Sequence, residues 1–283
     1  HGFEIRRRKI GLRGHVFPPD LNYNIRIAYG RQNSTVSVED ASLEYMFATE
    51  WGLKVGQWKG HLIREETIAA GQQLAVERSL LNERLAGGVT DFVQGVAFIN
   101  LQDRFRAEVA ATDGHGSANT DCKDQRGPVI PPSTTPDSRF RREYGFIARG
   151  EYKLAGNWTS YNDFTALDNS QTFAALGTGA DYTVGGDSWW LVHTADAQIE
   201  MGGTGMYIAY VGMLGELDAG QSFYDLGALA QIGQVIPGTR WEPFVRYDFI
   251  LFDETGLATG ANNFFNEFTV GVNYYFKRHN GKS

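Results

Sequence analysis

The segment LNYNIRIAYG, from Leu21 to Gly30, decides the fold class of this chain. Apolar side chains occupy every second position, and polar or small ones lie between them: Leu21, Tyr23, Ile25, Ile27 and Tyr29 against Asn22, Asn24, Arg26 and Ala28. Alternation with a period of two predicts a β-strand with one apolar face. That face could contact either a protein core or lipid, and tyrosines at its ends are typical of a membrane–water interface.

The same pattern recurs along the whole chain, in about thirteen segments joined by turn residues. They lie at 3–17, 21–30, 36–48, 51–60, 89–100, 103–112, 140–154, 172–183, 188–200, 205–214, 223–232, 240–251 and 264–276. The 34 glycines, 13 tyrosines and 18 phenylalanines favour strands and turns over helices. No second domain is visible, so residues 1–283 are predicted to form a single all-β domain.

The length and the ends of these segments favour lipid over a soluble core. Strands of about ten residues, tilted by about 40°, rise roughly 25 Å, the height of the apolar band of an outer-membrane barrel. Aromatic residues close several apolar faces, as at Phe47, Tyr274 and Phe276. We therefore expect a transmembrane antiparallel β-barrel in the outer membrane of a Gram-negative-type bacterium. A soluble β-sandwich that acts as a binding module is the alternative.

Composition and missing motifs disfavour other classes of protein. A formal net charge of −7, without a basic run that includes aromatics, argues against nucleic acid as a partner. The single cysteine, Cys122, allows no disulfide or multi-cysteine metal site within the chain. The sequence has no phosphate-binding loop, nucleophile elbow or histidine pair with metal spacing. The expectation is that the chain is not an enzyme and uses no cofactor and no metal.

Several longer stretches resemble a known family. They are FEIRRRKIGLRGHVFPPDLNYNIRIAYG, VEDASLEYMF, LKVGQWKGHLIREE and LAVERSLLNE, followed by HTADAQIEMGG, WEPFVRYDFI and EFTVGVNYYFKRHNGK. In this order, over nearly the whole chain, they resemble the phosphate-selective porin O and P family of outer-membrane porins. The resemblance implies a homotrimer of sixteen-stranded barrels, each with one loop folded into its channel. Against that pattern, the chain is expected to lack one N-terminal and two C-terminal strands.

Residues 61–88 are the one segment with a helical pattern, because Leu74, Leu81 and Leu85 recur at helical spacing. The resemblance implies that this segment is the constriction loop. Its charged residues include Arg64, Arg78, Arg84 and Glu77, which could either anchor the loop to the barrel wall or contact a solute. Residues 113–138 read as an external loop, and residues 155–171 fit no expected element.

Arginines on the inward phase are the candidate solute path, since a guanidinium group can donate to two oxygens of one anion. Family members carry an arginine pair that matches Arg6 and Arg7, although these could instead lie at the membrane rim. Arg26 and Arg246 have the inward phase on later strands. The chain is therefore expected to be a porin for passive diffusion of small hydrophilic, anionic, phosphate-like solutes. The alternative is a structural barrel with a blocked lumen that scaffolds envelope partners.

Overall fold

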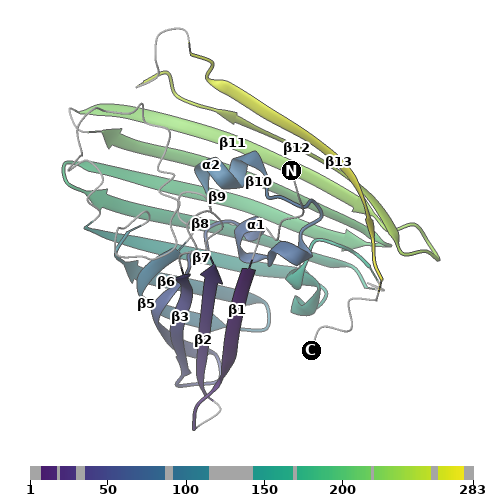
Figure 1. Ribbon diagram of the computed structural model, residues 1–283, viewed down its shortest axis with the longest axis horizontal. Helices are drawn as coiled ribbons and strands as arrows, with labels where there is room; N and C mark the ends of the chain where they lie inside the picture. Colours follow the sequence, from purple (N-terminus) through teal and green to yellow (C-terminus); the bar gives the residue numbers. More distant parts are fainter. Residues whose placement is uncertain are drawn as a thin grey trace.

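The computed structural model describes residues 8–17, 20–29, 36–86, 92–114, 143–167, 171–217, 220–255 and 261–276. Within these ranges, thirteen strands form one antiparallel sheet in which consecutive strands are neighbours (Figure 1). The strands are β1 (Arg8–His15), β2 (Leu21–Tyr29), β3 (Val36–Met46), β4 (Trp51–Lys59), β5 (Phe92–Leu101), β6 (Phe105–Thr112), β7 (Tyr144–Ala155), β8 (Phe173–Gly185), β9 (Ser188–Met201), β10 (Thr204–Leu217), β11 (Gln221–Gln234), β12 (Trp241–Leu251) and β13 (Phe264–Tyr274). The predicted all-β antiparallel fold is confirmed, and each predicted segment overlaps one of these strands.

Antiparallel neighbours place successive connections at opposite ends of the sheet. The connections after β4 and β6, residues 60–91 and 113–143, leave from the same end, called here the long-loop end. The opposite, short-turn end carries tight hairpins such as that between β9 and β10. There Gly202 and Gly203 have φ values of 58° and 83°, which a two-residue hairpin turn needs and most other residues avoid.

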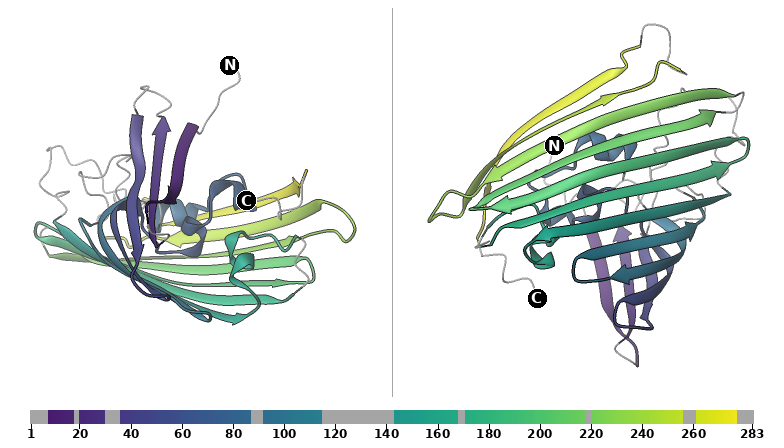
Figure 2. Two further views of the ribbon diagram at one scale, coloured as in Figure 1. Left: turned by 90° about the horizontal axis from the view of Figure 1, so that it is seen from below. Right: turned by 180° about the vertical axis from the view of Figure 1, so that it is seen from behind.

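The sheet is bent into a trough with the β4–β5 connection inside it (Figure 2, left). Strands β1 to β3 rise on one side of the trough, and β12 and β13 form the opposite side. β1 and β13 are the two edge strands of the described sheet, so the barrel is not closed between them.

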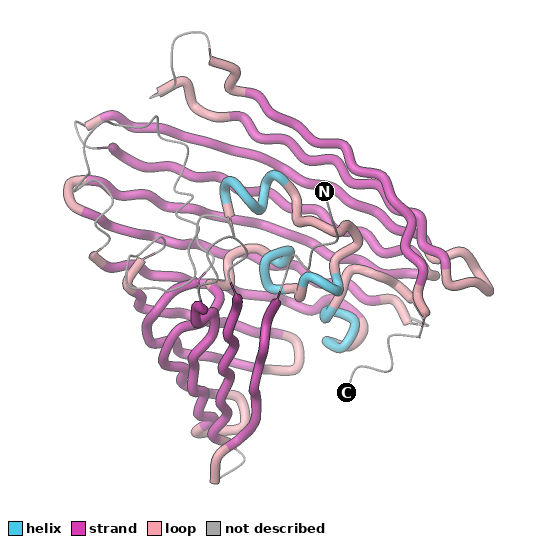
Figure 3. Tube along the Cα trace, in the orientation of Figure 1, coloured by secondary structure: helices cyan, strands magenta, loops and turns pink. Residues whose placement is uncertain are grey.

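The connection between β4 and β5 contains three short helical pieces, α1 (Arg64–Thr67), η1 (Ala70–Gln72) and α2 (Leu80–Leu85), which lie on the concave side (Figure 3). The expectation of one helical stretch that includes Leu74, Leu81 and Leu85 is therefore met only at α2. Elsewhere the backbone carbonyls accept hydrogen bonds from side chains, as when Arg78 Nη2 donates to the carbonyl of Ile68 at 3.0 Å. In the described residues no helix is long and apolar enough to cross a membrane.

One irregularity of the sheet matters for the inner face. Arg26 pairs with Asp40 and Ile27 pairs with Val38, so Glu39 is an extra residue in β3. Such a β-bulge interrupts the strict alternation of the strand. Both Glu39 and Asp40 are consequently buried, although they are consecutive in the sequence.

Candidate functional site

The convex face of the sheet is apolar and uncovered. On β13, Phe268, Val270 and Val272 are 68 %, 65 % and 59 % exposed, and similar side chains project from the strands between β1 and β12. No second sheet covers this face in the described ranges, as a soluble sandwich would require. An apolar surface of this extent exceeds what soluble monomers expose, and lipid is the medium that accepts it.

Aromatic side chains collect at the short-turn end of this face. The rings of Phe47 and Trp51 lie 6.0 and 5.1 Å from that of Phe98. At the other side of the sheet, the rings of Trp241 and Tyr274 are 4.7 Å apart. Aromatic side chains that border an apolar band form the interfacial girdle typical of an outer-membrane β-barrel. The chain is an outer-membrane β-barrel protein.

The concave face holds residues 60–86 through charged groups of the wall. Arg149 of β7 and Asp196 of β9 form a buried ion pair, with Nη1 and Oδ2 2.8 Å apart. Arg149 Nη1 also donates to the carbonyl of Leu62 at 3.0 Å, and the Thr194 hydroxyl donates to the same carbonyl at 2.7 Å. Asp196 accepts from the backbone N–H of Arg64 at 3.3 Å. The start of the loop is thus fixed to three wall residues.

A second set of wall contacts holds the end of the loop. Arg246 of β12 donates from Nη1 to the carbonyl of Glu77 at 2.8 Å, and Asp248 accepts from the N–H of Leu81 at 3.3 Å. Asn273 of β13 donates to the carbonyl of Leu74 at 2.9 Å. These side chains satisfy loop backbone groups that would otherwise be buried without a partner.

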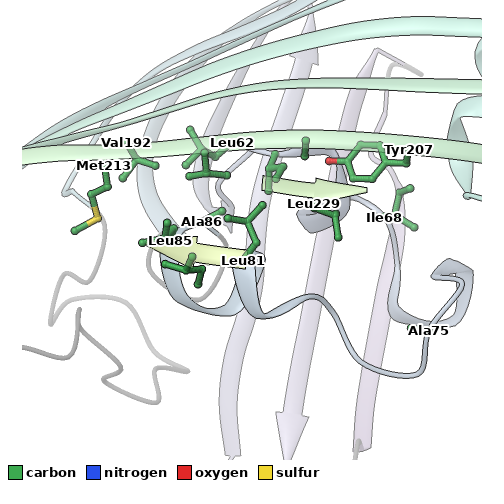
Figure 4. Packing of buried hydrophobic residues seen from close by; sticks show 14 of the residues in the cluster. Leu62, Ile68, Ala75, Leu81, Leu85, Ala86, Val192, Tyr207, Met213 and Leu229 are labelled. Atoms are coloured by element: carbon green, nitrogen blue, oxygen red, sulfur yellow. The ribbon is translucent and has the colours of Figure 1, made fainter. Parts of the chain in front are cut away.

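Apolar contacts complete the docking (Figure 4). Loop side chains pack with buried side chains of β9 to β12; those shown include Leu62, Ile68, Leu81, Leu85, Val192, Tyr207, Met213 and Leu229. Leu62 and Leu81 are fully buried, and each such side chain contributes roughly 1.5–3 kcal/mol relative to exposure in water. Gly179 of β8 allows the close approach, since a Cβ there would lie 2.5 Å from the Leu62 carbonyl oxygen.

Glu65 links the two ends of the loop. Its carboxylate accepts from the backbone N–H of Ser79 at 2.8 Å and from the Ser79 hydroxyl at 2.6 Å. Ser79 in turn caps α2, because its hydroxyl oxygen accepts from the N–H of Asn82 at 3.0 Å. Burial raises the pKa of Glu65 to about 6, although the bonds from Ser79 and the charge of Arg246 act in the opposite direction.

The neighbouring Glu66 has the opposite shift. It forms ion pairs with Lys59 at the end of β4 and with Arg78, whose Nε lies 3.4 Å from Oε2. Burial alone would raise its pKa, but Lys59 and Arg78 outweigh burial and lower the pKa of Glu66 to about 2. Glu66 is therefore charged at neutral pH and ties the loop to β4.

The loop leaves the inner face of β1 to β4 uncovered, and a cavity of about 520 Å³ lies there. Its lining combines four cationic side chains with two acidic ones: Arg13, Arg26, Lys54 and Lys59, with Asp40 and Glu44. Trp58, His61 and Thr67 also border it. Arg26 forms an ion pair with Asp40, with Nη1 and Oδ2 3.0 Å apart, and Lys54 forms one with Glu108, with Nζ and Oε2 2.8 Å apart.

Arg13 differs from the other cations of the cavity. It is exposed and makes no ion pair with another described residue. It lies on β1 opposite Asn24 of β2, on the face away from Ile10 and Leu12. The arrangement can hold a small anion near a cation that is not already neutralised.

The predicted solute-path residues have different surroundings. Arg6 and Arg7 lie outside the described residues. Arg26 lines the cavity. Arg246 is 2 % exposed and lies beneath the loop, where it contacts Glu267 at 2.8 Å as well as the loop carbonyls.

The predicted constriction-loop residues also differ from one another in their contacts and burial. The guanidinium carbon of Arg64 lies 3.8 Å from the ring centroid of Tyr161, and Arg78 donates to loop carbonyls. Glu77 is half-buried and holds Arg246 through its carbonyl. Arg84 is exposed on α2. Arg64 thus contacts the connection that follows β7, and the contacts of Arg78 lie within the loop itself.

Sequence reasoning missed two groups of residues. Arg13 and Lys9 occupy odd positions of β1, whereas Ile10 and Leu12 occupy even positions on the apolar face. This alternation was a usable signal that Arg13 faces inward. The Arg149–Asp196 pair carried no signal, because its two members are 47 residues apart and meet only across the intervening strand β8.

The comparisons with known proteins concern the fold alone. No protein-family model and no curated protein matches the chain. Among solved structures, it is similar to the in-vitro folded trimer form of OmpT, an outer membrane protein of Vibrio cholerae, with 10 % identity and a TM-score of 0.47, covering 95 % of this chain and 91 % of that chain. A loop L8 deletion mutant of the same protein gives 9 % identity and a TM-score of 0.46, with 95 % and 90 % covered. No family model therefore supports the resemblance to the phosphate-selective porin O and P family.

The prediction that the chain is not an enzyme is corrected. Four solved structures that resemble it are forms of OmpT, and a likeness at 9–11 % identity neither assigns an activity nor excludes one. The prediction rested on missing sequence motifs, whereas catalytic groups are recognised by their geometry and can occur in any chain order. Missing motifs are therefore no basis for that conclusion.

Proposed function

We propose that the chain is an outer-membrane diffusion channel for small hydrophilic solutes, with a preference for anions. The observation that carries this proposal is the cavity beside β1 to β4, which the docked loop leaves open. Residues 60–86 fill the other side of the trough, so they would act as the constriction loop of the channel.

Charge in a narrow passage with low-dielectric walls acts over a longer range than charge on an open surface, because the field is focused and poorly screened. The other three cations of the cavity, Arg26, Lys54 and Lys59, each form an ion pair with a carboxylate. Arg13 is then the group that would draw an anion into the passage. A guanidinium group also suits phosphate-like oxygens, which supports the phosphate-like solute implied by the sequence resemblance.

The second candidate function is a structural barrel that scaffolds envelope partners. The tight docking of the loop favours it, because the loop contacts β7 and β9 through buried hydrogen bonds and β12 and β13 through partly buried ones. The two functions differ in one property, the passage of ions.

We also propose a homotrimer, on the sequence resemblance alone, and cross-linking in the membrane would test it.

The test is single-channel recording of the full chain in a planar bilayer under a potassium chloride gradient. Discrete current steps are expected, with a reversal potential closer to the equilibrium potential of chloride than to that of potassium. Arg13→Ala is expected to shift that potential toward potassium, whereas Arg104→Ala, an exposed arginine in the β5–β6 turn, leaves it unchanged. Added phosphate that reduces the current would support the phosphate-like solute. Inserted protein without steps would contradict the channel and favour the structural barrel.

A further inference from the structure

A second segment also enters the trough, from the opposite end. Residues 156–167 follow β7 at the short-turn end and contain η3 (Trp158–Asn162). Trp158 and Tyr161 are 8 % and 3 % exposed and pack with Phe173 and Ala175 of β8. The segment therefore lies folded against the inner wall.

Polar contacts hold this segment at both ends. The Trp158 ring nitrogen donates to the carbonyl of Asp103 at 2.7 Å, and the Thr165 hydroxyl donates to Glu242 at 2.9 Å. Gln198 of β9 donates to the carbonyl of Asp163 at 2.7 Å. These contacts make the segment a fixed support.

Tyr161 is where this support meets the constriction loop. The guanidinium carbon of Arg64 lies 3.8 Å from the centre of the Tyr161 ring, and Arg64 is 6 % exposed. Arg149 Nη2 donates to the Tyr161 hydroxyl at 3.4 Å while Nη1 of the same arginine holds the Leu62 carbonyl. A desolvated cation over an aromatic ring is among the stronger contacts of its kind.

The chain of contacts continues from Arg64 to the cavity. Arg64 Nη1 donates to the hydroxyl of Thr67, and that hydroxyl donates to the carbonyl of Arg64 at 2.9 Å. Thr67 and His61 both line the cavity, so they flank the residues that Tyr161 and Arg149 hold. The cavity rim, defined as residues 61–67, thus depends on a side chain that itself lies outside the cavity lining.

We infer that Tyr161 is a positioning residue for the channel: by holding Arg64 it fixes the cavity rim and so sets the size of solute that passes. The part concerning solute size rests on the proposed function. The positioning part does not, and a measurement that needs no conductance can test it.

The experiment is amide hydrogen exchange of the full chain in lipid, followed by single-channel recording of the same variants. Tyr161→Ala is expected to speed exchange in residues 61–67 about tenfold, because it removes the stacked ring. Tyr161→Phe retains the ring and should stay within about twofold of the parent protein. Tyr152→Ala, which removes an outward-facing tyrosine from β7, is the matched control and should leave the rim unchanged.

If Tyr161→Ala does not assemble, Arg64→Gln tests the same contact, because it keeps a polar side chain and removes the cation that lies over the ring. Unchanged exchange at the rim in an assembled variant would overturn the inference. Faster exchange with a larger conductance and passage of larger neutral polymers would support both parts. Faster exchange with an unaltered size limit would overturn the size role. Faster exchange in a chain that never conducts would support positioning and contradict the proposed function.

Discussion

The inner faces of β8–β12 and of β1–β4 start from the same alternating pattern and differ in what covers them. On β8–β12, polar residues such as Asp196, Arg246 and Asp248 are buried under the loop. On β1–β4, Arg13 and Arg26 border an open cavity. Alternation therefore sets which side chains face inward, but it does not set whether they meet water, a loop or a solute.

The difference teaches where charge has a structural role. A buried ion pair costs desolvation and needs hydrogen bonds on its remaining atoms, which the loop backbone supplies to Arg149 and Asp196. A pair in a wet cavity, such as Arg26 with Asp40, keeps part of its hydration. We expect the covered half to respond strongly to single substitutions and the open half to respond weakly in stability.

The largest effect is expected from Asp196→Ala in the covered half. It removes two of the three carboxylate hydrogen bonds of the buried Arg149 guanidinium group, which keeps Glu151 at 2.8 Å, and the free energy of unfolding should fall by about 3 kcal/mol, the low end for a broken buried pair. Denaturant titration of the folded protein in detergent, followed by tryptophan fluorescence, measures the change. Asp103→Ala removes the partner of Lys153, but Asp103 is 87 % exposed in that pair, so less than about 1 kcal/mol is expected. Equal losses of unfolding free energy in the two variants would show that buried and solvent-exposed ion pairs contribute equally to stability.

The second effect is the pH dependence of loop docking. The pKa of Glu65 is raised from 4.5 to about 6 in the docked loop, so docking takes up a proton and weakens as pH rises through this range. The difference of 6 minus 4.5 corresponds to about 2 kcal/mol. Hydrogen exchange in residues 61–86, corrected for its intrinsic pH dependence, should therefore be slower at pH 5 than at pH 7.

Glu65→Gln should abolish this dependence, since the amide does not titrate. Glu83→Gln changes an exposed carboxyl group on α2 and should preserve it. Glu66, with a pKa lowered to about 2, contributes docking strength that is complete above pH 4.5 and is lost only below that value. A docked loop that is equally protected at pH 5 and pH 7 would contradict the assignment to Glu65.

A smaller effect is expected where the loop backbone approaches the wall. Gly179→Ala places a Cβ 2.5 Å from the Leu62 carbonyl oxygen, which forces the loop outward. The cost should be about 1 kcal/mol, at the low end for overpacking, because a loop can shift more easily than a strand. Unfolding midpoints compared with Gly150→Ala isolate the effect, since a Cβ at Gly150 meets only the ring of Phe105, at 3.6 Å. Equal midpoints would mean that the loop is not tightly docked at Leu62.

The smallest effect is expected from Arg26→Ala in the open half. Arg26 is 34 % exposed, and its buried partner Asp40 also lines the cavity, where water can replace the lost guanidinium group, so the free energy of unfolding should change by less than about 1 kcal/mol. The same titration measures it, with Asn24→Ala on the same strand face as the control. A loss as large as that of Asp196→Ala would show that the cavity charges also hold the fold together.

Much of the fold could be predicted from local pattern because strand alternation is a local property. The segments at 21–30, 51–60 and 240–251 match β2, β4 and β12 to within one residue at each end. The extra residue Glu39 escaped prediction, because a bulge depends on pairing with β2 and not on the sequence of β3 alone. The helical spacing of Leu74, Leu81 and Leu85 also misled, since the wall supplies hydrogen bonds that a helix would otherwise make internally.

The sequence by itself determined the single antiparallel sheet, its apolar outer face and the inward phase of Arg26, because these follow from residue type and a period of two. Only the tertiary structure decided which inward charges are buried, since that depends on where residues 60–86 dock. It also decided the role of residues 156–167, which showed no pattern in the sequence. Tyr161 and Arg64 are 97 positions apart, and their contact exists only because two connections from opposite ends of the sheet meet inside it.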